Sequence, residues 1–410
     1  MTAKRLCLST SFTKKIYSAL ILKICDYLSD RSSLRLLFVT RNHLATNYQI
    51  KSYINAAFIK NIKYPIKKIW NVTSTENLSE NITHLTFEAW FNKPVTTLPK
   101  CITRLTFGQY FNSPVDKLPK YVTHLTLGRN FNQPVDNLPK SITHLTFKND
   151  FNQPVNNLPQ SITKLIFGEC FNQPINNLPK SITHLRLKSR FTQPINNLPQ
   201  TITHLTLGMY FNHPVDNLPP TVTHLTFGEK FNQPVDNLPE SVTHLIFGAY
   251  FNHPVDKLPK FVTHLTFGCF FNQPVDNLPQ TLTHLTFEYD FNQSVDKLPQ
   301  SITHLFFNGL FNQTIDNLPH FLTHLTLTGP FNQPIDNLPH SLTHLILGDN
   351  FNQSVNHLPK SITHLTFGKS FNWDVNNLPQ SIRHLTFSRK FRGAISNLPR
   401  SLQSFVHSKP

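Results

Sequence analysis

One histidine position recurs at multiples of 20 residues through most of the chain. Imidazole changes its charge between about pH 5 and 8 and is a common ligand of transition metals. A column of imidazoles one repeat apart could therefore bind metal ions, sense pH, or form a stacked ladder with only a structural role. The fourteen copies are His84, His124, His144, His184, His204, His224, His244, His264, His284, His304, His324, His344, His364 and His384.

The surroundings of this column argue against metal binding. Arg104, Lys164 and Ser404 replace the histidine in three units, and no carboxylate or thiol accompanies the imidazoles. Neighbouring imidazoles on one flat face do not form the tetrahedral site that zinc prefers, so we expect no metal site and no cofactor. If the rings stack, their charged forms repel one another, which should lower their pKa values and reduce the stability of the fold in acid.

A second set of candidates lies just before each Phe-Asn pair, where the units differ most from one another. Charged residues such as Arg129, Glu169 and Lys230 also occupy these places. Exposed aromatic residues among charges are typical of a protein-binding surface. Drift of loop residues after duplication of the unit would give the same variation, so both interpretations remain open. The aromatic candidates for target binding are Trp90, Tyr110, Tyr210, Tyr250, Phe270 and Tyr289.

The column histidines and the residues before each Phe-Asn pair both belong to a 20-residue repeat, whose fold must position them. Sixteen consecutive units begin at residues 91, 111, 131 and so on to 391, and a half-unit at 81–87 precedes them. In the unit 131–150, residues 141–147 (SITHLTF) alternate in polarity and are rich in β-branched residues, which predicts a strand. Residues 131–139 (FNQPVDNLP) contain two prolines and turn-forming residues, which predicts an irregular return arm. Since one unit cannot bury its apolar face alone, we expect the units to stack into a parallel β solenoid.

Alternation within the strand predicts which side chains form the core. Leu145 and Phe147 should point inward and His144, Thr146 and Lys148 outward. The Asn at the second place of each unit should satisfy backbone groups of the turns, which have no partner in the sheet. The arm should add Phe131, Val135, Leu138 and Ile142 to the core.

The pattern F-N-x-P-[VI]-x-x-L-P-x-[ST]-[IVL]-T-H-L-x-[FL] resembles the FNIP repeat family. Its L-P-x-x-I-x-x-L-x-F part is similar to the short, LPX-type leucine-rich repeat of the same length. The resemblance covers residues 81–407. It implies a curved, leucine-rich-repeat-like solenoid that acts as a protein-interaction module.

The first 60 residues differ from the repeats. Apolar residues at helical spacing in 16–28, followed by apolar stretches at 34–39 and 53–59, predict a module of three helices. Residues 24–41 resemble an F-box, whose pattern runs I-x-x-Y-L, then L-x-x-L, then V-x-R, although Ile16-Tyr17-Ser18-Ala19 replaces its usual L-P-x-E. The resemblance implies that adaptor binding would involve Leu20, Leu22, Ile24, Leu28, Leu34, Leu37 and Val39.

Together the two resemblances imply three segments: an F-box-like helical module (1–60), a linker or N-terminal cap (61–80) and an FNIP repeat solenoid (81–407). This combination is familiar among giant viruses of amoebae. It implies the substrate receptor of a cullin-type ubiquitin ligase, which binds a Skp-family adaptor through the F-box and a target protein through the solenoid. The alternative is a scaffold or decoy that uses the repeats alone.

The composition bears on other classes of function. A catalytic site needs unlike groups at one place, whereas His, Asp and Thr here repeat identically, so we expect no enzyme. The net charge is +16, with 13 Lys and Arg against 5 Asp and Glu in the first 90 residues. No basic run, RNP-like motif or zinc spacing accompanies this charge, which favours a solvated basic face over nucleic-acid binding.

The cysteines and the hydropathy bear on the compartment. The cysteines are odd in number and widely spaced, and they form no C-x-x-C motif, which is typical of a reducing compartment. No run of 18 apolar residues and no secretory cleavage site are present. We therefore expect a protein of the cytoplasm, or of the host cytoplasm or nucleus if it is viral, that does not enter a membrane. The five cysteines are Cys7, Cys25, Cys101, Cys170 and Cys269.

Overall fold

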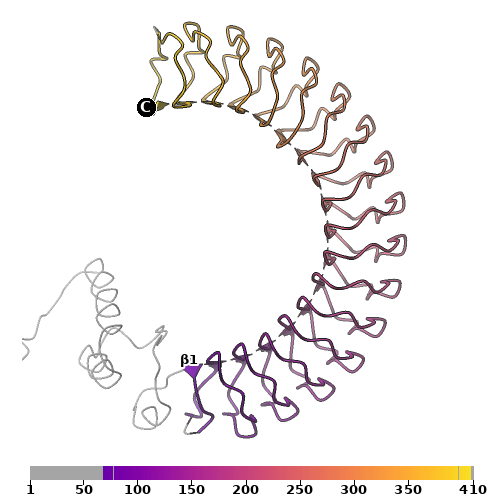
Figure 1. Ribbon diagram of the computed structural model, residues 1–410. Coiled ribbons are helices and arrows are strands. Elements are labelled where there is room, and N and C mark those ends of the chain that lie inside the picture. The colour runs from indigo at the N-terminus through magenta and orange to yellow at the C-terminus, as the bar shows by residue number, and fades with distance from the viewer. Residues whose placement is uncertain (1–67, 77, 396, 408–410) are drawn as a thin grey trace, which may run out of the picture. The chain divides into compact units, whose positions relative to one another are not determined.

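The computed structural model describes residues 68–76, 78–395 and 397–407 (Figure 1). These residues form strands and turns, with no helix among them. They divide into two compact units, one reaching to residue 153 and including 157–162, the other made of 154–156 and the residues from 163 onward. The F-box-like module lies outside the described residues, as do its predicted adaptor-binding residues Leu20, Leu22, Ile24, Leu28, Leu34, Leu37 and Val39.

The first unit is a row of five parallel strands. Each strand pairs with the next one along the chain, and from β2 onward the paired residues are 20 positions apart, as in Leu105 and Leu125. The predicted parallel stacking of the units is thus confirmed for these strands. The strands are β1 (Lys68–Val72), β2 (His84–Phe87), β3 (Arg104–Thr106), β4 (His124–Thr126) and β5 (His144–Thr146).

Strand β1 begins the sheet before the first repeat and inside the segment predicted as a linker or cap. It pairs in parallel with β2 through Lys68 and His84, and the register shifts between Ile69 and Val72. Asn71 lies at this irregularity with φ of 54°. Asparagine tolerates this left-handed conformation better than most residues, so the local sequence suits the bulge.

The second unit has the same kind of strand pairing and contains thirteen strands. All neighbouring pairs in it are parallel and in register, for example Leu285 with Leu305. Within this unit the strands lie along the inner side of an arc and the return arms along its outer side (Figure 1). The strands are β6 (Lys164–Ile166), β7 (His184–Arg186), β8 (His204–Thr206), β9 (His224–Thr226), β10 (His244–Ile246), β11 (His264–Phe267), β12 (His284–Phe287), β13 (His304–Phe307), β14 (His324–Leu327), β15 (His344–Leu347), β16 (His364–Phe367), β17 (His384–Phe387) and β18 (Ser404–His407).

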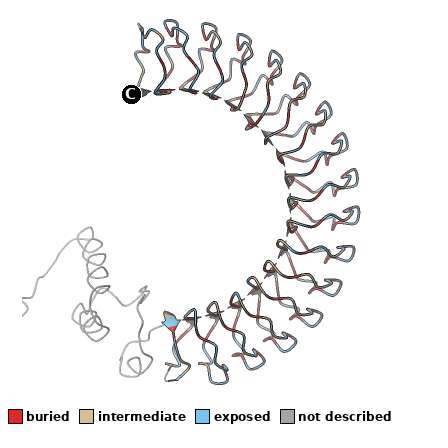
Figure 2. Ribbon diagram, in the orientation of Figure 1, coloured by how far each residue is buried: buried red, intermediate tan, exposed pale blue. Residues whose placement is uncertain are grey.

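The core is formed by the residues that alternation predicted. Leu145 and Phe147 are buried, His144 and Thr146 are partly exposed, and Lys148 is exposed. Figure 2 shows the same change between buried and exposed residues around each turn of the chain. Each turn therefore covers the apolar face of the next, which is why single repeats of this type are not stable alone. The arm residues Phe131, Val135, Leu138 and Ile142 are also buried.

Phenylalanine rings form two adjoining stacks in the core. In the first unit, Phe107 of the strand side lies 3.8 Å from Phe111 of the arm, measured between ring centroids. Phe111 in turn lies 6.1 Å from Phe131 of the next repeat, with the rings almost parallel. These contacts link strand to arm and repeat to repeat, and each buried ring adds about 1.5–3 kcal/mol of hydrophobic stabilisation.

The prolines and asparagines satisfy the backbone of the arms. The carbonyl of Pro139 accepts a hydrogen bond from the backbone N–H of Ile142 (3.1 Å), which closes the turn into the strand and uses only the group that proline retains. The side-chain oxygen of Asn112 accepts a hydrogen bond from the backbone N–H of Asn132 (2.8 Å), and the same bond recurs along the array. The predicted asparagine ladder is confirmed.

Glycine follows the strand in many repeats because consecutive turns approach closely there. A Cβ atom placed on Gly248 would lie 1.9 Å from the carbonyl oxygen of Gly228 in the preceding repeat. Such a contact forces the backbone to move, so the missing side chain permits this spacing.

Candidate functional site

The histidines form a ladder on the sheet face that is not covered by the arms. The rings of His284 and His304 are 4.2 Å apart between centroids and 10° from parallel. Spacings of 4.1 to 4.3 Å recur from His184 to His384 in the second unit, whose strands run along the inner side of the arc (Figure 1). The predicted stacking of these side chains is confirmed.

A threonine precedes most of these histidines and determines which ring nitrogen carries the proton. The hydroxyl of Thr283 donates to the carbonyl of Thr263 (3.0 Å) and lies 2.9 Å from Nδ1 of His284. A hydroxyl has one hydrogen and a carbonyl can only accept, so Nδ1 must donate to the hydroxyl oxygen. The neutral ring is therefore the Nδ1–H tautomer, and Nε2 is the nitrogen that gains a proton in acid.

Burial lowers the pKa of ten of the column histidines below the ordinary value of 6.5, and nearby positive charges lower it further. For His284 these charges belong to other rings of the column, including His264. For His84 they belong to Lys68 and Arg104. The direction of the pKa shift agrees with the sequence prediction. Burial is its largest single cause, ahead of the repulsion from any one neighbouring ring, on which that prediction was based.

The second candidate set occupies a turn between each strand and the following arm. The backbone N–H of Tyr250 donates to the carbonyl of Glu229 in the preceding repeat (2.8 Å), and that of Phe270 donates to Ala249 (2.8 Å). The same bond recurs in most of the described repeats. These turns form a hydrogen-bonded row of their own, so their side chains project from a fixed backbone.

In the first unit this row exposes one aromatic pair. Trp90 is 71% exposed, and its ring stacks on Tyr110 at 4.1 Å between centroids and 13° between planes. Tyr110 is only partly exposed because the indole covers it. Two of the six predicted target-binding residues are therefore in contact here.

In the second unit the row carries a longer group, which we name the aromatic ridge. Its central residues touch: the Lys230 ammonium lies 3.5 Å from the centroid of the Tyr250 ring, and Tyr250 meets Phe270 edge-on at 4.9 Å. The four other predicted target-binding residues belong to this ridge, and each is 43 to 56% exposed. The ridge consists of Tyr210, Lys230, Tyr250, Phe270, Asp290 and Leu310, with Tyr289 beside Asp290.

Sequence reasoning missed several exposed apolar residues. Leu310 extends the ridge and is 42% exposed. Tyr121, Phe261 and Phe321 are more than half exposed and stand at the place before the strand where most repeats carry Ser or Thr. Their departure from the consensus at a polar position was the signal that could have identified them.

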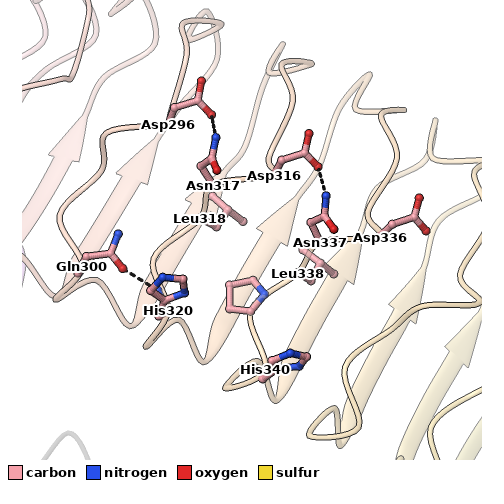
Figure 3. Close-up of a pocket in the computed structure, with 11 residues that line it drawn as sticks. Asp296, Gln300, Asp316, Asn317, Leu318, His320, Asp336, Asn337, Leu338 and His340 are labelled. Carbon is pink, nitrogen blue, oxygen red and sulfur yellow. Dashed lines mark hydrogen bonds between the residues drawn. The ribbon is translucent and has the colours of Figure 1, made fainter.

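A hollow of about 530 Å³ lies over the return arms of the second unit. Figure 3 shows Asp296, Asp316 and Asp336 in a row, with His320 and His340 on the opposite side. Asp296 accepts a hydrogen bond from Nδ2 of Asn317 (3.2 Å), and Asp316 accepts one from Asn337 (3.0 Å). The lining contains no hydroxyl or thiol side chain, and its groups repeat from one arm to the next, a pattern that suits hydrogen bonding to a ligand better than nucleophilic catalysis.

No group of three or more His, Cys, Asp or Glu side chains in the described residues could hold a metal ion. Within those residues no helix is long and apolar enough to span a membrane. Cys101, Cys170 and Cys269 are free thiols.

Solved structures include one with clear similarity to this chain. It bears the description "The crystal structure of CroV588 a novel circular LRR protein structure", with 36% identity and a TM-score of 0.69, over 86% of this chain and 67% of that one. The functional domain of InlJ from Listeria monocytogenes aligns over 77% of this chain and 70% of its own with a TM-score of 0.50, but its 11% identity shows only the fold. No curated protein matches.

The family comparison matches most of the repeat array. The model described as FNIP Repeat matches nine segments between residues 134 and 390, some of which overlap, namely 134–170, 171–210, 194–230, 211–249, 231–270, 271–310, 311–350, 331–370 and 351–390. These segments cover more than half of the chain, and the structure over them is a parallel β solenoid with a leucine-rich-repeat-like relative. The chain belongs to the FNIP repeat family.

Proposed function

We propose that this chain is the substrate receptor of a Skp–cullin–F-box ubiquitin ligase, in which the repeat array captures a target protein. Repeat arrays of this type are typical protein-interaction modules. The observation that carries the target-binding half is the row of exposed aromatic residues on hydrogen-bonded turns, above all Trp90 and the aromatic ridge. Aromatic anchors on a rigid backbone lose little entropy on binding, so they contribute strongly to affinity.

The adaptor-binding half rests on the sequence of residues 1–60. There Leu20, Leu22, Ile24, Leu28, Leu34, Leu37 and Val39 are proposed to contact a Skp-family adaptor, which in turn joins the cullin. Residues 61–80 then lead into the solenoid and include β1. Catalysis would belong to the partners, in the cytoplasm or in the nucleus of a host cell.

A scaffold or decoy that binds its partner through the repeats alone is the second candidate. It needs only the repeats, which carry the exposed aromatic groups described above, from Trp90 to Phe321. The two candidates make the same prediction for target binding and opposite predictions for adaptor binding.

Affinity purification from a eukaryotic cell lysate separates them. The full chain is compared with a variant that carries Leu22→Asp, Ile24→Asp and Leu28→Asp, and bound proteins are identified by mass spectrometry. Point substitutions are preferable to deletion of residues 1–80, because that deletion would remove β1 and expose the edge of β2. Equal thermal unfolding of the two proteins serves as the control for an intact array.

The ligase proposal predicts that Skp and cullin subunits are recovered with the unaltered chain and lost with the triple variant. Target proteins bound by the array should be recovered with both. Recovery of array partners without Skp or cullin from either protein would contradict the ligase role and leave the scaffold.

A further inference from the structure

We infer that the aromatic ridge binds one amphipathic α-helix of the target, with the apolar stripe of that helix along the ridge, a carboxylate opposite Lys230 and a cation opposite Asp290. This inference rests on the proposed target binding and adds the kind of segment that is bound. It is carried by the spacing of the ridge residues, by their exposure and by the two charges among them.

The backbone sets the spacing of the ridge. Each ridge residue donates its N–H to the preceding repeat, as Lys230 does to Met209 (2.8 Å) and Leu310 does to Tyr289. Successive ridge side chains therefore start about 4.8 Å apart, the distance between neighbouring strands. The 4.9 Å separation of the Tyr250 and Phe270 rings agrees with this value.

This spacing matches a helix better than an extended segment. Apolar residues along one face of an α-helix recur every 3.5 residues on average, or about 5.2 Å. Side chains on one face of a β-strand recur about every 6.7 Å. Over the five intervals from Tyr210 to Leu310 the ridge spans about 24 Å, a helix needs about 26 Å, and a strand about 33 Å. Over this length, the side chains of a helix stay within about 2 Å of the ridge residues that they face. Those of a strand are displaced by more than the distance between two neighbouring repeats.

Two charged residues of the ridge set the direction in which the helix would bind. Neither Lys230 nor Asp290 forms a salt bridge within the described part of the chain, and the two residues lie three repeats apart. Three repeats span about 14 Å, which corresponds to nine to eleven residues along a helix. Opposite charges at that separation on the helix would pair with Lys230 and Asp290. Pairs of this kind contribute to the choice of partner more than to affinity.

Two display libraries of equal diversity, selected on the full chain, test the inference. One varies the outer face of a single helix on a small helical scaffold, and the other varies one face of a β-hairpin. Binders from each are then measured against the unaltered chain, the double variant Tyr250→Ala with Phe270→Ala, and the control Phe321→Ala. Phe321 is a matched control because it is 67% exposed in the same unit but lies outside the ridge.

The expected result is that the helix library yields binders with apolar residues at i, i+3 or i+4, and i+7, and with an acid and a base nine to eleven residues apart. Their affinity should fall at least about tenfold on the double variant and stay unchanged on Phe321→Ala. Lys230→Glu should weaken them, and a Lys in place of the helix acid should restore binding.

Three results would overturn the inference. These are ridge-dependent binders that come from the hairpin library, binders that ignore the double variant, or no ridge-dependent binder from either library. If the chain still recovers proteins from a lysate in any of these cases, the proposed target binding stands and only the helix inference fails.

Discussion

The Lys230 ammonium lies over the ring of Tyr250, 3.5 Å from its centroid, although the two residues belong to different repeats. The contact is possible because the array places every residue beside the one 20 positions later. Residues that differ between neighbouring repeats, such as Lys230 and Tyr250, therefore lie side by side on the surface and can contact each other. In a nearly uniform chain, such differences are what distinguish one part of the surface from another.

This contact should contribute measurably to stability. A double-mutant cycle with Lys230→Met and Tyr250→Leu is expected to give a coupling energy of about 0.5–1 kcal/mol in urea unfolding, the range for exposed cation–π pairs. The pair Lys260 and Phe261, at 5.2 Å, is the matched control and should show weaker coupling. Equal coupling in both pairs would mean that the shorter distance has no energetic effect.

The histidine ladder should make the fold sensitive to acid. The pKa values in the folded state are lowered below 6.5, so the unfolded chain binds protons more readily. The stabilising effect is complete above about pH 6.5 and is lost as the pH falls below it through the lowered values. The midpoint of thermal unfolding is therefore expected to fall between pH 7.5 and pH 5.5.

Substitutions can assign this pH dependence to the ladder. His284→Gln with His304→Gln should reduce the fall in the unfolding midpoint, because two stacked imidazoles no longer titrate. His320→Gln with His340→Gln is the control, because neither histidine belongs to the column. The ladder has no part in the effect if both double variants behave alike.

Removing one threonine hydroxyl should weaken the strand region. Thr283→Val deletes the group that donates to Thr263 and accepts from Nδ1 of His284. The expected loss is about 1–2 kcal/mol in the free energy of unfolding, since a partly buried carbonyl and an imidazole lose a partner. Thr286→Val is the control, because Thr286 forms no side-chain hydrogen bond with the described residues, and it should change the stability by less than about 0.5 kcal/mol.

The Nδ1–H tautomer can be observed directly. Nitrogen-15 spectra of histidine-labelled protein at pH 7.5 should show protonated Nδ1 and unprotonated Nε2 for the column residues. In the Thr283→Val variant the signal of His284 should shift toward the Nε2–H form that free imidazole side chains favour. A column that is protonated on Nε2 would contradict the assigned hydrogen bonds.

The asparagine ladder should protect the turns from solvent exchange. Asn272 accepts from the backbone N–H of Asn292 (3.0 Å), so Asn272→Ala should speed hydrogen exchange at that amide. Asn277 uses its side chain as a donor to Asp256 (3.0 Å) and supports no backbone group by that bond. Exchange at Asn292 should therefore be unchanged in Asn277→Ala, and equal exchange in both variants would show that the ladder does not protect it.

The repeat frame, the parallel register and the buried face could be predicted from the sequence, because each follows from polarity that alternates within a fixed period. Leu145, Phe147 and Asn132 are where that reasoning places them. Strand β1 could not be predicted, since the sequence of residues 68–72 lies outside the repeat pattern and pairs only because β2 offers a free edge.

The residues of the candidate site could be predicted from the sequence, but the contacts between their side chains could not. The variable positions identified Tyr250 and Phe270, but their contact, and the cover that Trp90 gives to Tyr110, depend on rotamers that the sequence does not specify. Phe321 was not predicted because it lies outside the variable turns, at a position that is Ser or Thr in most repeats.

The central claim is that the exposed aromatic residues on the hydrogen-bonded turns of the array bind a protein. The most direct test is quantitative affinity purification with the unaltered full chain, the Tyr250→Ala and Phe270→Ala double variant and the Phe321→Ala control, each shown by thermal unfolding to be folded at the temperature of the assay. The account predicts a protein that is recovered with the unaltered chain and the control and is depleted at least about tenfold with the double variant. Recovery of the same proteins in equal amounts by all three would contradict it.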